Sequence, residues 1–122
     1  MKIAKFCVAF VSLFLTLHEA SGADFSASVV VPTAQELAGL LSGRTMEGTY
    51  ADGSLVQSKY GTDGSLTASA PRFYDTGRGR VEDGKVCGSL RKIGDFCNDA
   101  RFDSGVLLLR RLNGKIVRYE LK

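Results

Sequence analysis

Four Asx-Gly pairs divide residues 44–122 into short segments, and this feature constrains the fold more than any other. The pairs are Asp52-Gly53, Asp63-Gly64, Asp83-Gly84 and Asn113-Gly114. Glycine supplies the positive φ that type I′ hairpin turns need, and Asp or Asn tolerates it at the preceding position. The segments between the pairs are dissimilar, so they do not form a repeat array. The pattern predicts an antiparallel β-meander.

A short helix is predicted ahead of the meander, over residues 34–42. Thr33 and Glu36 have the spacing of a capping box, in which each side chain accepts a hydrogen bond from the backbone of the other residue. Gly43 stands where a left-handed C-cap belongs. Three leucines follow the capping box at helical spacing and form a stripe for burial: Leu37, Leu40 and Leu41.

The last hairpin has the clearest pattern. With a two-residue turn at Asn113-Gly114, Arg110 pairs with Val117 and Leu108 pairs with Tyr119. The more apolar face is predicted to meet the core: Val106, Leu108, Leu112, Val117, Tyr119 and Leu121. Leu107, Leu109 and Arg111 then lie on the opposite face. A slip of one residue would invert the faces, so burial should fix the register.

Residues 78–82 (RGRVE) also alternate, with charged side chains on one face and Gly79 and Val81 on the other. Glycine on an inward face allows a close approach, and the short helix is predicted to lie there. One helix with six to eight strands gives an α+β fold. We expect one short N-terminal helix packed on an antiparallel β-meander, as a strongly bent sheet or a small barrel-like domain.

The N-terminus has the three parts of a secretory signal. Lys2 and Lys5 precede an apolar run over residues 6–17, and the small and polar residues 18–23 follow it. A run of about 12 residues suits a signal core and is shorter than the ~20 residues that a membrane span needs. We therefore predict a cleaved signal peptide over residues 1–22 and a single exported domain over residues 23–122. A retained membrane anchor is the alternative.

Two cysteines remain once Cys7 leaves with the signal peptide. Cys87 and Cys97 are an even pair in an oxidising compartment, which predicts a disulfide. They bracket a further hairpin, whose turn at residues 91–94 would place them face to face. Closing so short a loop stabilises a domain by about 3 kcal/mol in the chain-entropy model. A free thiol pair or a redox centre is the alternative, although the C-x-x-C spacing is absent.

Histidine chemistry is excluded from the mature domain, because His18 is the single histidine and lies in the predicted signal peptide. Serine and cysteine triads and histidine-ligated zinc are thereby removed. A carboxylate pair of the glycosidase kind is what remains for catalysis, and the glutamates available are Glu36, Glu47, Glu82 and Glu120. Each has an ordinary capping or surface explanation. We expect no enzyme activity, no metal and no cofactor.

Charge is unevenly spread along the domain. Residues 23–71 hold two basic and five acidic residues, a net charge of −3, whereas residues 72–122 hold twelve basic and seven acidic residues, a net charge of +5. Such asymmetry can mark a surface for an anionic partner. The candidate contact residues are Arg78 and Arg80 with the nearby Phe73 and Tyr74. The alternative is a solvated strand face with exposed arginines. The segment lacks the phosphate-loop pattern G-x-x-x-x-G-K.

One set of motifs runs through most of the domain: residues 36–48 (ELAGLLSGRTMEG), residues 60–64, residues 75–81, and residues 83–87 followed by Cys97. Their order resembles small exported alphaproteobacterial proteins with an uncharacterised domain of the form L-x-G-x-T-x-x-G…DG…C…C. In that pattern an aromatic residue stands where this chain has Arg80. The resemblance implies a periplasmic or secreted setting and supplies no site residues.

The sequence therefore predicts a non-enzymatic exported module for binding or interaction. Its partner would be an unknown protein or an anionic component of the envelope, with no specific nucleic acid and no membrane span after processing. A structural protein of envelope maintenance is the first alternative. A carboxylate-dependent hydrolase is the second.

Overall fold

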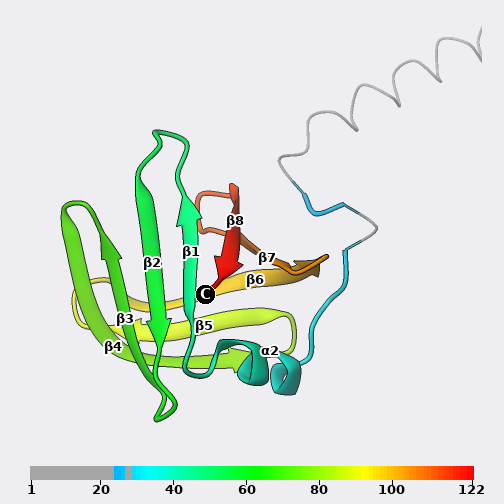
Figure 1. The fold of residues 1–122 in the computed structure, drawn as a ribbon, viewed down its shortest axis with the longest axis horizontal. Coiled ribbons are helices and arrows are strands. Elements are labelled where there is room, and N and C mark those ends of the chain that lie inside the picture. The colour runs from blue at the N-terminus through cyan, green and yellow to red at the C-terminus, as the bar shows by residue number, and fades with distance from the viewer. Residues whose placement is uncertain (1–23, 27–28) are drawn as a thin grey trace, which may run out of the picture.

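Eight antiparallel strands close into a barrel in the computed structural model, which describes residues 24–26 and 29–122 (Figure 1). Each strand pairs with the next along the chain, and the last pairs with the first, with Gly48 opposite Tyr119. The strands are β1 (Thr45–Thr49), β2 (Leu55–Tyr60), β3 (Ser65–Ala70), β4 (Phe73–Glu82), β5 (Lys85–Leu90), β6 (Gly94–Asp103), β7 (Val106–Arg110) and β8 (Ile116–Leu121).

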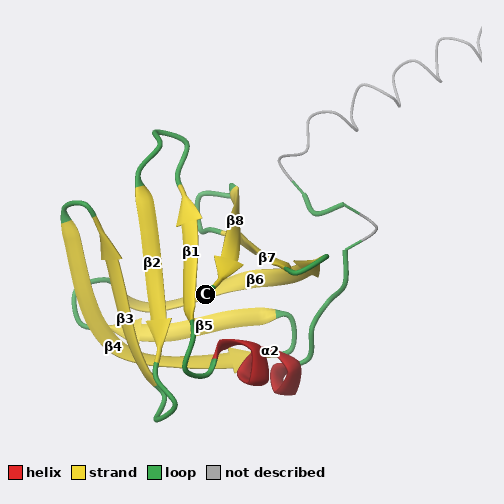
Figure 2. Ribbon diagram, viewed as in Figure 1, coloured by secondary structure: helices red, strands yellow, loops and turns green. Residues whose placement is uncertain are grey.

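The predicted meander and helix are therefore present, and the barrel-like alternative for the sheet is confirmed. The α+β description is partly right, because the fold is mostly β with one short helix among the described elements (Figure 2). The predicted signal peptide lies outside the described residues. No helix in the described ranges is long and apolar enough to cross a membrane.

Helix α2 (Ala34–Leu41) lies across one end of the barrel and closes it (Figure 1). The predicted capping box is present: the Thr33 hydroxyl accepts from the Glu36 N–H at 3.1 Å, and the Glu36 carboxylate accepts from the Thr33 N–H at 2.9 Å. Gly43 has the predicted positive φ, at 74°. Leu37 and Leu41 are fully buried in the barrel and form its floor.

Two contacts from the barrel hold α2 in this position. The Asp83 carboxylate, in the turn between β4 and β5, accepts a hydrogen bond of 2.8 Å from the Ala34 N–H in the first turn of the helix. At the other end, the Gly43 N–H donates to the Tyr60 carbonyl at the end of β2, at 2.8 Å. The anchored helix therefore closes one end of the barrel. The opposite end is formed by the loops that follow β1, β3, β5 and β7.

The Asx-Gly pairs form hairpin loops as predicted, but most are not two-residue turns. Tyr50, Gly61 and Arg111 each donate to the carbonyl four residues on, and each accepts from the glycine three residues on. These are three-residue loops with the glycine at positive φ. In each loop a side-chain oxygen, of the Asp carboxylate or the Asn amide, accepts a hydrogen bond from the backbone N–H two residues later. Asp83-Gly84 is a two-residue loop between Glu82 and Lys85.

The register predicted for the last hairpin is wrong by one residue on β7. The three-residue loop pairs Leu109 with Val117 and Leu107 with Tyr119. Val117, Tyr119 and Leu121 of β8 face inward as predicted. On β7, however, Leu107 and Leu109 are buried, and Arg111 follows them on the inner face. Leu112, predicted to be in the core, is 84% exposed.

The alternation predicted for residues 78–82 is confirmed, with Arg78, Arg80 and Glu82 exposed on the outer face of β4. Helix α2 packs against β4, but the space over Gly79 is filled by the Tyr60 ring. A Cβ at Gly79 would lie 2.8 Å from Cε2 of that ring. Glycine is therefore required at this position for Tyr60 to lie inside the barrel.

The predicted disulfide joins Cys87 of β5 to Cys97 of β6. The two residues are direct cross-strand partners, with their Cα atoms 4.0 Å apart. Val86, Leu90 and Phe96 line the interior of the barrel, as predicted. Because side chains alternate along a strand, the two cysteines point to the opposite face. The disulfide therefore lies on the outer face and fastens two strands that the ladder already pairs.

Candidate functional site

The interior of the barrel contains a cavity of about 340 Å³. Its lining reaches the loops at the end opposite α2, through Tyr50, Ile93 and Asn113, so the cavity opens at that end. Most of the inward side chains around it are apolar: Met46, Val56, Ala68, Ala70, Val86, Leu90, Phe96 and Leu109. The volume is near the lower end of the range for small-molecule sites.

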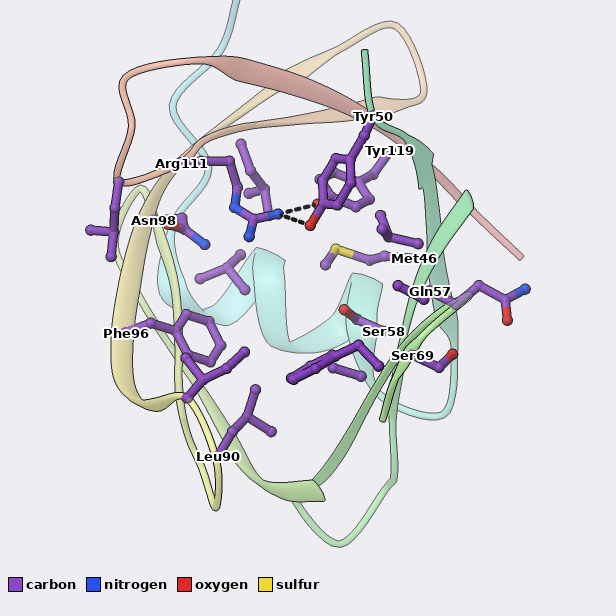
Figure 3. Close-up of a pocket in the computed structure, with 18 of the residues that line it drawn as sticks. Met46, Tyr50, Gln57, Ser58, Ser69, Leu90, Phe96, Asn98, Arg111 and Tyr119 are labelled. Carbon is purple, nitrogen blue, oxygen red and sulfur yellow. Dashed lines mark hydrogen bonds between the residues drawn. The ribbon is translucent and has the colours of Figure 1, made fainter. Parts of the chain in front are cut away.

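Arg111 is the one charged side chain among the residues that line the cavity. Its Nη1 donates to two tyrosine hydroxyls, to Tyr50 at 2.7 Å and to Tyr119 at 3.2 Å (Figure 3). The guanidinium also lies 5.4 Å from the centroid of the Tyr50 ring. Within the described part of the chain, no carboxylate forms an ion pair with Arg111. A half-buried cation is thus held in place by neutral groups.

The protonation states of this cluster follow from its burial. Burial raises the pKa of Tyr119, and the Arg111 charge opposes this rise without cancelling it. Burial lowers the pKa of Arg111, but the two tyrosines outweigh this and leave its pKa above the ordinary value. Arg111 is therefore a cation and Tyr119 a neutral phenol at neutral pH.

Asn98 places a polar side chain at the same level of the cavity. It lies on β6, where Asp99 pairs with Arg110 of β7, so the same register puts Asn98 opposite Arg111. Asn98 is only 8% exposed, and its amide points into the cavity (Figure 3). The side-chain amide forms no hydrogen bond with any other described residue, and it is not fully enclosed. The amide therefore faces the cavity itself.

The rim of the open end carries exposed apolar side chains. Ile93 is 52% exposed in the β5–β6 loop, and Leu112 is exposed in the β7–β8 loop. Phe73, at the start of β4, is also exposed and lines the cavity. Exposed apolar residues scattered singly are ordinary, but a group of them around the mouth of a cavity indicates a binding surface.

Asp75 fixes the loop that carries Ile93. Its side chain is 2% exposed and accepts hydrogen bonds from the backbone N–H groups of Lys92 and Ile93, at 2.9 and 3.0 Å, and of Thr76. Burial raises the pKa of this carboxyl, but the three N–H groups and the Lys92 charge lower it more, and the net pKa is below the ordinary value. The ionised form is therefore the one that folding favours.

This contact predicts a loss of stability in acid. A depressed folded-state pKa gives stability that is present above the unfolded pKa of about 3.9 and is lost as the pH falls through the folded value. We expect Asp75→Asn to lower the melting temperature by several degrees at pH 7 and by much less at pH 2. Melting curves by circular dichroism across this range measure the difference. An equal loss at both pH values would contradict the role assigned to the carboxylate.

The four residues predicted to contact an anionic partner lie in different settings. Arg78 donates to the Asp63 carbonyl at 2.7 Å, and Arg80 forms an exposed ion pair of 3.4 Å with Glu82. Both lie on the outer face toward the α2 end. Tyr74 lies on the same face near the open end, and Phe73 lies at the cavity mouth. The four residues are spread along the length of β4.

The candidate catalytic glutamates lie outside the cavity lining. Glu36 belongs to the capping box and Glu82 to the ion pair with Arg80. Glu47 and Glu120 are direct cross-strand partners of β1 and β8, with the Lys122 Nζ at 3.8 and 3.7 Å from their carboxylates. This pair is on the outer face, where Glu120 is exposed and Glu47 is partly covered and accepts a hydrogen bond of 2.7 Å from the Gln57 amide. Near Glu82, Cys87 and Cys97 could form a metal site only as free thiols, and they form the disulfide instead.

Three polar residues of the cavity, Tyr50, Asn98 and Arg111, were missed by sequence reasoning. Arg111 was assigned to the outer face through the wrong hairpin register, while Tyr50 and Asn98 carried no motif. The signal available in the sequence was the alternation of side chains between the two faces of a strand. Arg111 lies two residues after Leu109, and Asn98 lies two residues after Phe96. An inward position follows for both once the neighbouring apolar residue is known to be inward.

No protein-family profile, curated protein or solved structure matches this chain. The resemblance to small exported alphaproteobacterial proteins therefore stays a prediction from its motifs.

Proposed function

We propose that this protein is a non-enzymatic binding module that takes a small, largely apolar ligand into its barrel. The observation that carries the proposal is the cavity of about 340 Å³, closed at one end by α2 and lined mainly by apolar side chains. An apolar ligand gains about 0.8 kcal/mol for each methylene group that it buries. The exposed apolar side chains at the rim offer such a ligand its first contact.

A hydrolytic role for the cavity has less support. General acid–base catalysis by carboxylates needs two of them on either side of a bound substrate. Among the described residues that line the cavity there is no Asp and no Glu. A purely structural role in envelope maintenance gives no reason for an open cavity with an arginine in it. The binding role accounts for both features.

Export is part of the proposal. The apolar run over residues 6–17 is typical of a signal core, and the disulfide is compatible with an oxidising compartment. We propose that the mature domain works in the periplasm or outside the cell.

Filling part of the cavity should weaken ligand binding. Ala68 lies on the inner face of β3 and lines the cavity. A phenyl ring at this position occupies space that a ligand would use. If Ala68→Phe displaces only two methylene groups of a ligand, affinity falls about tenfold. Calorimetric titration with 1-octanol, a small neutral amphiphile, measures this change.

The matched control is Thr67→Phe, one residue earlier on the same strand. Thr67 pairs with Lys59 and Thr76 on the outer face, so the same ring is added outside the barrel. We expect the octanol affinity of this variant to equal that of the wild type. If both variants bind octanol like the wild type, the cavity is not the site at which apolar ligands bind.

A further inference from the structure

We infer that the ligand carries an anionic oxygen group, a carboxylate or a chemically similar oxyanion. This group binds to Arg111 near the open end of the cavity. This inference rests on the proposed function and specifies the class of ligand. It starts from the fact that Arg111 is the one charged residue in the lining, and that it is a cation without a described carboxylate partner.

The hydrogen bonds of Arg111 leave its carboxylate-binding edge free. Both of its side-chain hydrogen bonds within the described chain, to Tyr50 and to Tyr119, come from the same nitrogen, Nη1. Within the described chain, Nε and Nη2 have no partner. These two atoms form the fork that takes a carboxylate through two parallel hydrogen bonds. The tyrosines thus orient the guanidinium without using the edge that a ligand would need.

The polar groups around Arg111 have hydrogen-bond donors that no described residue uses. The Tyr50 and Tyr119 oxygens accept from Arg111, so each O–H hydrogen remains free to donate. The Asn98 amide, opposite Arg111 and more than nine-tenths buried, adds two further N–H donors without a described partner. An ionised carboxylate is an acceptor only. A cluster rich in unused donors is therefore complementary to it.

The apolar wall of the cavity determines the chemistry of the rest of the ligand, which should be apolar. Away from Arg111 the wall of the cavity is apolar, with Met46, Leu90 and Phe96 on the surrounding strands (Figure 3). A ligand that fits has an apolar body of modest size and one anionic end. A small anion without an apolar body would gain only the polar half of these contacts.

Octanoate, 1-octanol and acetate separate these contributions. The first two share a chain and differ in charge, and acetate keeps the charge without the chain. We expect the wild type at pH 7 to bind octanoate about tenfold or more tightly than octanol, since hydrogen bonds between charged groups are about twice as strong as neutral ones. We expect no measurable binding of acetate at millimolar concentration.

The test of Arg111 is Arg111→Met, with Arg118→Met as its matched control. Both remove one positive charge, but Arg118 is exposed on the outer face of β8. We expect Arg111→Met to lower octanoate affinity to that of octanol and to leave octanol affinity unchanged, while Arg118→Met binds both like the wild type. Arg111→Lys, which keeps the charge but loses the fork, should bind octanoate at an intermediate strength. Circular dichroism establishes that each variant is folded.

Three results would overturn the inference. If wild-type protein binds octanol as tightly as octanoate, the cavity is a neutral apolar site, and the proposed function stands without the anionic group. If Arg118→Met weakens octanoate binding as much as Arg111→Met, the effect is one of net charge. If neither compound binds, the proposed function fails together with the inference. The first comparison uses only the wild type, so it stands even if a variant does not fold.

Discussion

Leu37→Ala is expected to lower the free energy of unfolding by about 3 to 5 kcal/mol, the largest loss among the substitutions considered. Leu37 is 0% exposed and forms the floor of the barrel with Leu41. Alanine at this position leaves a void below the existing cavity, which the rigid wall cannot close. Urea unfolding followed by far-UV circular dichroism measures the loss. It is a large share of the 5–15 kcal/mol typical of a small domain.

Leu40→Ala is the matched control for this prediction. It makes the same substitution in the same helix, but Leu40 is only half-buried, beside Val30 and Phe102 outside the barrel. We expect a loss of about 1 kcal/mol, in the range of ordinary substitutions away from a core. Equal losses in the two variants would contradict the assignment of Leu37 to the barrel floor.

Removal of the disulfide is expected to cost about 3 kcal/mol. Cys87 and Cys97 are 10 residues apart, and opening so short a loop returns conformational entropy to the unfolded chain. The native ladder between β5 and β6 pairs these residues in any case, so the barrel should keep its circular dichroism spectrum after reduction. Urea unfolding of Cys87→Ser/Cys97→Ser protein gives the magnitude.

Reductant supplies the control. Dithiothreitol should lower the stability of the wild type to that of the double variant and leave the double variant unchanged. Alkylation of the native wild type without reductant should label neither cysteine. Labelling of both would show that the thiols are free, and it would remove the support that the disulfide gives to export.

Local features of the fold were predictable because each depends on residues close in sequence. The capping box of Thr33 and Glu36 and the positive φ of Gly43 need only a few residues around them. The pairing of Cys87 with Cys97 needed only a symmetric hairpin between them. Closure of the barrel is different, because it depends on Gly48 meeting Tyr119 across most of the chain.

The candidate site was hidden by one ambiguity in turn chemistry. Asn113-Gly114 fits both a two-residue turn and the last two positions of a three-residue loop, since glycine has positive φ in each. The observed three-residue loop shifts β7 by one residue, and such a shift exchanges the inner and outer faces. Arg111 thereby moves from the predicted outer face to the cavity. Prediction of Arg111 as a cavity residue therefore depended on a one-residue difference in the register of β7.

The methyl resonance of Met46 gives the most direct test of binding inside the barrel. Met46 lines the cavity, and besides Met1 it is the only methionine in the chain. Protein with ¹³C-labelled methionine methyl groups therefore carries one probe within the cavity. Titration with octanoate is predicted to shift this resonance saturably, with the affinity found by calorimetry. A Met46 resonance that stays unchanged while calorimetry reports binding would place the ligand elsewhere and contradict the account.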